Sequence, residues 1–294
     1  MKSSRQQFGG NWTEEKLERV RKYLVAYATL MSNQPFRIAY IDAFAGTGYR
    51  SLRSEEDQNE LMFPELAAQD TQRFLDGSAR IALQVRPRFS KYIFIEKDPE
   101  RIAELCKLKD EFSELKADIQ IEEAEANIYL QNLCSKQWIK HGRRAVLFLD
   151  PFGMQVQWKT IEAIAQSQAI DLWLLFPLGV AVNRLLRRDA KIGPTWWTKL
   201  DNFFGTQEWF DVFYETRRSI DLFGEQVITQ KVSDFDSIGQ FFVDRLRTIF
   251  AGVHPKPLPL YNTKGNPLYL LCFVAGNPKG AKLALRIAQD ILRR

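Results

Sequence analysis

The sequence predicts an α/β fold, in which helices cover a mostly parallel β-sheet. Short apolar runs rich in β-branched and aromatic residues alternate with stretches of helical periodicity, which is typical of strands buried on both faces of a sheet. A glycine-containing turn follows the first run, and two strands joined by a short turn lie near the C-terminal end. The predicted parallel strands begin at Ile38, Tyr92, Ile119, Ala145 and Ile170, and the later pair is Leu258 to Tyr261 and Leu268 to Val274.

A helix is predicted ahead of the first strand, from Thr13 to Met31. Thr13 is a suitable N-cap, and two glutamates follow it in the first turn, where the helix dipole favours acids. Apolar residues recur at helical spacing and form one buried stripe. We expect the basic residues of this helix to lie on its solvated face: Lys16, Arg19, Arg21 and Lys22.

Composition limits the classes of protein that this chain can be. The 294 residues carry a net charge of +5 and a pI near 9.0, which is compatible with a nucleic-acid partner. The cysteines, three in number, are far apart and lack metal-ligand spacing, and the two histidines belong to no cluster. No apolar run has transmembrane length. We therefore expect a soluble, cytoplasmic protein without a metal site.

The stretch from Ile38 to Gly48 contains the strongest local motif. Asp42 ends the apolar run, and Phe44, Gly46 and Gly48 follow at alternate positions. Glycines without Cβ atoms let the backbone turn tightly and approach a ligand, and an acid at this position suits a ligand with an α-amino group. The third glycine of the dinucleotide motif and the lysine of the phosphate loop are absent. The alternative is a tight turn that binds no ligand.

Acids also follow the second and third predicted strands. Glu96 comes directly after the second strand, where an acid typically accepts hydrogen bonds from ribose hydroxyls. Asp98 could assist, but Pro99 follows it at the first helical position, which favours a plain N-cap role for Asp98 over a role in cofactor binding. Glu125 follows the third strand and could accept from the amino group of adenine, or it could cap the next helix.

The fourth strand ends in Asp150-Pro151-Phe152-Gly153, the second sharp motif. Proline turns the chain out of the sheet, and the carboxylate can accept protons of an exocyclic amine as a general base. The ring of Phe152 offers a surface on which a planar base could stack. The alternative is that Asp150 caps a turn and Phe152 packs in the core.

Two segments interrupt the regular alternation of strands and helices. Residues 49–76 form a long polar connection, which we interpret as a lid or substrate loop, or as disorder. Residues 180–232 are predicted to be a helical insertion that is rich in aromatic and basic residues. Such residues could bind nucleic acid, but interspersed acids favour a helical cap that buries its aromatics. These acids are Asp201, Glu208, Asp211 and Glu215.

The whole pattern resembles the three-Cys-motif partner (TcmP) family. The motifs are Y-I-D-A-F-A-G-T-G at 40–48, G-S-A-R-I-A-L at 77–83, F-I-E-K-D at 94–98, F-L-D-P-F-G at 148–153, V-N-R at 182–184, F-F-G-T-x-x-W at 203–209 and Y-L-L-C-F-V-A at 269–275. The resemblance implies a single domain over 1–294 with a Rossmann-like class I methyltransferase fold. Its sheet would have seven mostly parallel strands with an antiparallel C-terminal pair.

The resemblance also implies S-adenosyl-L-methionine as cofactor. It assigns Asp42, Phe44, Gly46 and Gly48 to the cofactor turn, Glu96 to the ribose, and Asp150 to Gly153 to the catalytic motif. D-P-F-G departs from the D-P-P-[YFW] of many DNA amino-methyltransferases and is closer to tRNA guanine-N2 dimethyltransferases. We therefore predict N-methylation of an exocyclic amine in nucleic acid, and the motif favours RNA over DNA as the substrate. The alternative is a non-catalytic binding protein that works with a three-Cys-motif protein.

Overall fold

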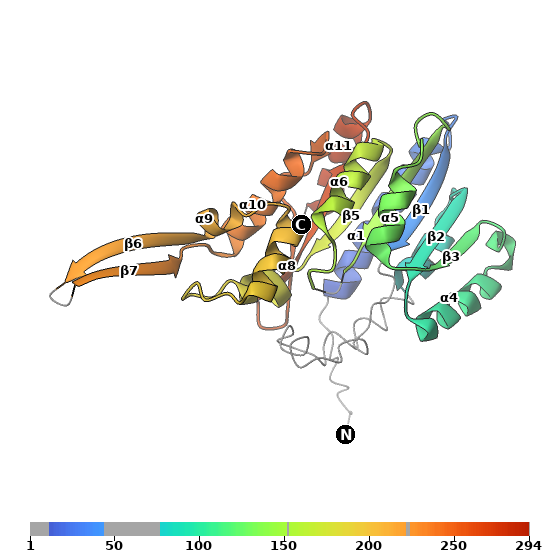
Figure 1. Ribbon diagram of the computed structural model, residues 1–294. Coiled ribbons are helices and arrows are strands. Elements are labelled where there is room, and N and C mark those ends of the chain that lie inside the picture. The colour runs from blue at the N-terminus through green and yellow to red at the C-terminus, as the bar shows by residue number, and fades with distance from the viewer. Residues whose placement is uncertain (1–11, 44–76, 152, 222–223, 294) are drawn as a thin grey trace, which may run out of the picture.

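The computed structural model describes residues 12–43, 77–151, 153–221 and 224–293 (Figure 1). Within these residues eight strands form one sheet in the order β3-β2-β1-β4-β5-β10-β8, with β9 paired to β10. The strands are β1 (Arg37–Ala43), β2 (Lys91–Glu96), β3 (Ile119–Glu123), β4 (Arg143–Leu149), β5 (Ile170–Phe176), β8 (Gly252–Val253), β9 (Leu258–Tyr261) and β10 (Pro267–Ala275).

Strand directions confirm the predicted fold class. β3, β2, β1, β4 and β5 are parallel neighbours, whereas β10 runs antiparallel to β5, β8 and β9. The sheet has one strand more than the seven expected. The addition is β8, a two-residue strand that pairs with the end of β10 and is too short to give a periodic signal.

Helices cover both faces of the sheet, so the molecule has three layers (Figure 1). Side chains alternate along each strand: Ala39 and Ile41 of β1 face one helical layer, and Ile38 and Tyr40 face the other. The layer that contacts Ala39 and Ile41 includes α5 (Ala126–Cys134), α6 (Trp158–Ser167), α8 (Pro194–Phe204) and α10 (Phe235–Arg247). The layer that contacts Ile38 and Tyr40 includes α1 (Trp12–Met31), the helical residues 77–84, α4 (Pro99–Glu111), the short η2 (Ser113–Leu115) and α11 (Ala281–Leu292).

The insertion after β5 is only partly helical. It contains η3 (Leu178–Val182), α7 (Asn183–Leu185), α8, α9 (Trp209–Phe213) and then a two-stranded hairpin of β6 (Tyr214–Asp221) and β7 (Gly224–Lys231). The prediction of helix throughout 180–232 is therefore wrong for its last third.

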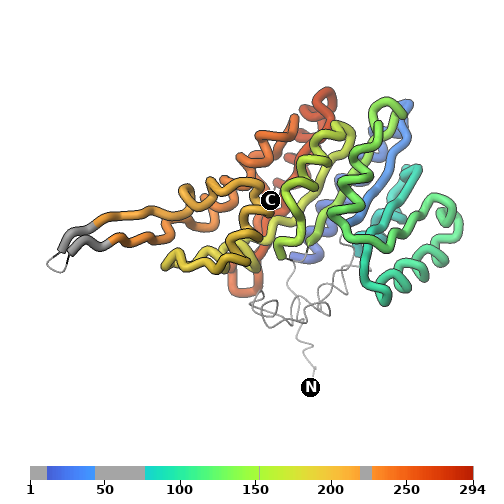
Figure 2. The backbone as a smooth tube through the Cα atoms, viewed as in Figure 1, coloured from blue at the N-terminus to red at the C-terminus, as the bar shows by residue number. Residues whose placement is uncertain are grey.

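The residues of the hairpin explain this correction. β-branched residues fit a pleated surface better than a helix, and several occur on these two strands. The hydroxyls of Thr216 and Thr229 lie 3.0 Å apart across the pair. Figure 2 shows the hairpin as an arm that projects away from the rest of the molecule.

Several aromatic residues of the insertion belong to a hydrophobic core. Phe203, Phe204, Trp209 and Phe213 are all buried. The ring of Phe203 lies 5.6 Å from that of Phe176 in β5, so the insertion packs against the end of the sheet. We interpret the insertion as a cap that buries its aromatic side chains, and for these four residues that interpretation is confirmed.

No helix in the described part of the chain is both long enough and apolar enough to span a membrane.

Candidate functional site

Three acidic residues meet at the carboxyl edge of the sheet. Asp42 of β1 is in register with Phe94 of β2 and Phe148 of β4. Glu96 and Asp150 each lie two positions beyond these partners. Because side chains alternate along a strand, all three acids are on the same face of neighbouring strands. The sequence-predicted acids are thus brought together.

Asp42 is completely buried, with 0% of its surface exposed. Its Oδ2 accepts a hydrogen bond from the Tyr40 hydroxyl at 3.0 Å, while its Oδ1 has no hydrogen-bond partner among the described residues. Burial raises the pKa of Asp42 from 3.8 to about 7, although the nearby hydroxyls of Ser78 and Tyr40 oppose the shift. A buried oxygen without a partner is costly, and a ligand with a donor would satisfy it.

Glu96 shows the same pattern at the end of β2. Its Oε1 accepts from the backbone N–H groups of Lys97 at 2.7 Å and Asp98 at 2.8 Å. Its Oε2 is buried and has no hydrogen-bond partner within the described residues. Burial raises the pKa of Glu96, and the positive charge of Arg101 partly opposes that shift. One oxygen is therefore used to fix the side chain and the other is available.

A cavity of about 450 Å³ begins beside Glu96. It lies where β2 and β3 end and α5 begins, and the segment after β4 supplies Gln155 and Gln157 to its lining. Side-chain Oε1 of Gln155 is a further buried oxygen without a partner in the described chain. Cavities of this volume hold small-molecule ligands. With an acid and amides around it, the cavity is suited to a nucleoside.

Asp98 and Glu125 both act as helix N-caps. Asp98 Oδ1 accepts from the backbone N–H of Glu100 at 2.9 Å, at the start of α4. Glu125 Oε2 accepts from the N–H of Ile128 at 2.9 Å, at the start of α5. The capping alternatives are thus observed for both. Glu125 also lines the cavity next to Glu96, whereas Asp98 does not.

Asp150 forms an ion pair that sequence reasoning missed. The Nζ of Lys16 in α1 lies 3.1 Å from Asp150 Oδ2, with 2% of the lysine side chain exposed and 15% of the aspartate side chain. The lysine amine also lies 4.9 Å from the centre of the Trp12 ring. Burial raises the pKa of Asp150, and Lys16 counteracts this shift.

The expectation of a solvated Lys16 is wrong because of its place on the helix. Trp12, Lys16, Val20 and Tyr23 follow one another at intervals of three or four residues, and all four are buried. Lys16 therefore belongs to the apolar stripe of α1. A single lysine within an otherwise apolar stripe was the signal that could have identified it.

Some of the predicted site residues belong to the described part of the chain and others do not. Pro151 and Gly153 are buried, and Gly153 has a φ of +58°, a left-handed conformation that favours glycine. Phe44, Gly46, Gly48, Phe152 and the connection 49–76 lie outside the described residues. Their predicted roles stay predictions.

Asn127 is a second residue that the sequence did not single out. Its Nδ2 donates to Glu125 Oε1 at 2.8 Å and to the carbonyl of Gln155 at 2.9 Å. Its Oδ1 accepts from the N–H of Gln157 and the hydroxyl of Thr160, both at 2.9 Å. This fully bonded amide ties the start of α5 to the segment after β4, and so positions two walls of the cavity.

Within the described residues, no group of three or more His, Cys, Asp or Glu side chains is arranged so that it could hold a metal ion. The site therefore offers acids, amides and one buried lysine. Such groups can bind hydroxyl and amino groups and can accept a proton.

No protein-family model matches this sequence, and no curated protein matches it. Among solved structures, protein LPL1258 from Legionella pneumophila, of the family model DUF519, has a TM-score of 0.47 and 13% identity, over 96% of this chain and 92% of its own. A conserved hypothetical protein from Streptococcus pyogenes has a TM-score of 0.31 and 14% identity, over 71% and 95%. The 23S rRNA methyltransferase ErmE has a TM-score of 0.27 and 11% identity, over 74% and 68%. At these values no activity transfers to this chain, and its resemblance to the TcmP family stays a prediction.

Proposed function

We propose that this protein is an S-adenosyl-L-methionine-dependent methyltransferase that methylates an exocyclic amine of nucleic acid, with RNA preferred to DNA. One observation carries the proposal: Asp42 Oδ1 and Glu96 Oε2 are buried oxygens on neighbouring strand ends, and neither has a described partner. Each such group costs about 1–3 kcal/mol when it is left unsatisfied. A ligand with hydrogen-bond donors facing both acids would remove that cost.

The residues present fit the donors of this cofactor. Glu96 would accept from the ribose hydroxyls, because it lines a nucleoside-sized cavity and its Oε2 has no hydrogen-bond partner among the described residues. Asp42 would hold the α-amino group, and its ionised form would pair with that cation. Glu125 and Gln155 would surround the adenine from the far walls of the cavity. When bound, the cofactor would supply an electrophilic methyl group.

Asp150 would position the methyl acceptor. Its Oδ2 is held by Lys16, which leaves Oδ1 to accept an N–H of the acceptor amine. The positive charge of Lys16 favours the ionised carboxylate, and the ion pair fixes its orientation. Holding the amine in line with a bound methyl group would supply most of the rate by proximity. The proton released from nitrogen would pass to Asp150 as general base.

The choice of nucleic acid rests on two sequence features. The net charge of +5 favours polyanions, and D-P-F-G at 150–153 resembles the motif of tRNA guanine-N2 dimethyltransferases. A cytoplasmic location belongs to the same proposal, because RNA substrates are found there.

The first test is calorimetric titration with S-adenosylmethionine and S-adenosylhomocysteine. We expect micromolar dissociation constants, about −8 kcal/mol, for the wild-type protein. Asp42→Asn and Glu96→Gln should each weaken binding at least tenfold. Glu123→Gln is the matched control. Glu123 is an exposed acid at the end of β3, so this substitution should leave both dissociation constants unchanged. Absence of binding in a well-folded sample would refute the proposed cofactor.

The second test measures transfer of a labelled methyl group to RNA and to DNA. Asp150→Asn should retain cofactor affinity and lose transfer, since it keeps the shape of the side chain but not its basicity. Transfer to DNA alone would overturn the preference for RNA. Equal loss of cofactor affinity in Asp150→Asn would contradict its assignment to the acceptor.

The alternative function is a non-catalytic protein that uses the same fold to serve a three-Cys-motif partner. The observation that favours it is the Lys16–Asp150 ion pair, because a carboxylate that is already paired is less basic. Cofactor binding without transfer to any nucleic acid, combined with stable association with the three-Cys-motif protein, would support this alternative.

A further inference from the structure

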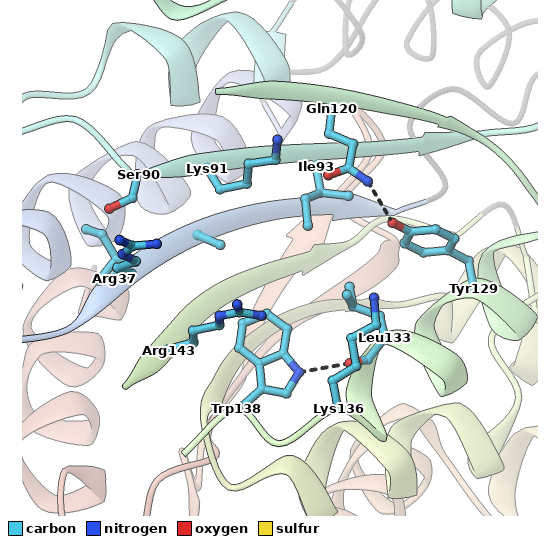
Figure 3. Close-up of a pocket in the computed structure, with 12 residues that line it drawn as sticks. Arg37, Ser90, Lys91, Ile93, Gln120, Tyr129, Leu133, Lys136, Trp138 and Arg143 are labelled. Carbon is cyan, nitrogen blue, oxygen red and sulfur yellow. Dashed lines mark hydrogen bonds between the residues drawn. The ribbon is translucent and has the colours of Figure 1, made fainter. Parts of the chain in front are cut away.

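A second polar cavity lies at the opposite, amino-terminal edge of the sheet. It has a volume of about 310 Å³ and is bordered by the starts of β1, β2 and β4 and by the segment after α5 (Figure 3). Four of its lining residues are cationic and none is acidic. These cations are Arg37, Lys91, Lys136 and Arg143.

Strand register brings three of the cations together. Arg37 of β1 is directly opposite Arg143 of β4, and Ala39 of β1 is opposite Lys91 of β2. Since side chains alternate, Arg37, Lys91 and Arg143 all lie on the sheet face that α5 covers. Like charges on neighbouring strands repel one another, so this arrangement is unfavourable by itself.

No described carboxylate relieves this repulsion through an ion pair. Other exposed arginines of the chain do have acidic partners: Arg187 lies 3.1 Å from Asp189, and Arg217 lies 2.9 Å from Glu215. None of the described ion pairs involves the four cations of the cavity. A concave site lined by one sign of charge concentrates counter-ions.

The walls behind the cations are aromatic and apolar. Trp138 is only 6% exposed, and its indole N–H donates to the carbonyl of Leu133 at 2.9 Å, which fixes the ring. The Tyr129 hydroxyl lies 3.4 Å from the side-chain amide of Gln120 (Figure 3). The same amide also donates to Glu122 at 2.5 Å. A planar base can stack on the half-buried ring of Tyr129 while its phosphate binds the cationic rim.

We propose that this cavity binds a nucleotide through its phosphate, either as a free mononucleotide or as one unit of a single strand. The site is separate from the carboxyl-edge site, because Arg37 and Asp42 lie near opposite ends of β1, roughly 16 Å apart at 3.3 Å per residue. It does not depend on methyl transfer, and its occupation can be measured with no cofactor present.

The test compares AMP and a fluorescent single-stranded RNA dodecamer as probes of the full chain. The double variant Arg37→Gln/Arg143→Gln should weaken binding of the occupying probe at least tenfold. The control Lys282→Gln/Arg286→Gln removes two exposed charges from α11, on the other face of the sheet, and should change binding less than twofold. Affinity for S-adenosylhomocysteine should be the same in both variants, which shows that the fold and the carboxyl-edge site are intact.

The two probes distinguish the source of the nucleotide. Binding of AMP that is lost in the test variant identifies a mononucleotide site. Binding of the dodecamer alone identifies a strand-binding site, and the slope of log K against log salt should then fall by about 0.7 in the test variant, because one phosphate contact is lost. The proposal is overturned if neither probe binds the wild type, or if the test and control variants bind equally well.

Discussion

Replacing Asp42 by asparagine should change how the stability of the protein depends on pH. The pKa of Asp42 is about 7 in the folded protein, against an ordinary value of 3.8, because the carboxylate is buried. The folded state therefore binds this proton more tightly than the unfolded state. The stability that protonation contributes is fully present below pH 3.8 and is lost as the pH rises through 7.

The magnitude follows from the size of the shift. A difference of 7 − 3.8 units at 1.36 kcal/mol per unit gives a total of about 4 kcal/mol, of which about 2 kcal/mol is lost between pH 5 and pH 7. Asparagine cannot titrate. The free energy of unfolding of Asp42→Asn should thus rise by about 2 kcal/mol relative to wild type between these two pH values.

Urea unfolding at pH 5, 6 and 7 and constant ionic strength measures this difference. Comparison of the two proteins at each pH cancels the titration of every other group. Glu123→Gln serves as control for the loss of one exposed carboxylate from the neighbouring part of the sheet. If the stabilities of Asp42→Asn and wild type change in parallel to within about 0.5 kcal/mol, the raised pKa of Asp42 is refuted.

Three further substitutions test other parts of the structure. Lys16→Met should leave S-adenosylhomocysteine affinity within about twofold in calorimetry and reduce methyl transfer roughly 100-fold. The acid limb of the rate–pH profile should move to higher pH, because Asp150 loses the positive charge that lowers its pKa. An unchanged profile would contradict this role. Gly205→Ala should destabilise the protein by about 3 kcal/mol in urea, since φ is +67° and the new Cβ would lie 2.0 Å from Trp158; a loss below 1 kcal/mol would show that the turn relaxes. Asn127→Ala should lower the free energy of unfolding by about 3 kcal/mol and weaken cofactor binding, because four hydrogen bonds disappear. Unchanged cofactor binding would show that Asn127 does not position the cavity walls for the cofactor.

Much of the sheet could be predicted because its strands are buried on both faces. An apolar run such as Ile170 to Phe176 has few alternatives to a central strand, and an acid directly after such a run must lie at the carboxyl edge. The alignment of Asp42, Glu96 and Asp150 then follows from parallel pairing. Their position at the carboxyl edge could therefore be predicted from the sequence, whereas their roles stay predictions.

The hairpin of β6 and β7 and the burial of Lys16 were not predicted, for different reasons. β6 and β7 project from the body, so their strands alternate without a core face and give no apolar period to detect. Lys16 is buried beside the carboxylate of Asp150, but a lysine on a helix is normally assigned to the solvated face. Only the position of β4, 134 residues later, shows why this lysine is buried.

The contact between α1 and α11 has a consequence for the synthesis of the protein. Arg19 in α1 donates to the carbonyl of Ile291 in α11, 272 residues further along the chain. At 5–20 residues per second, a ribosome needs about 14 to 54 s to make that length. During this time α1 has left the ribosome without its closing partner, while the strands that carry the acids appear one after another. Lys16 and Tyr23 of α1 can therefore meet Asp150 and Asp171 long before Arg19 meets its partner carbonyl in α11, so the charge of the acidic edge is balanced before the two helices close on each other.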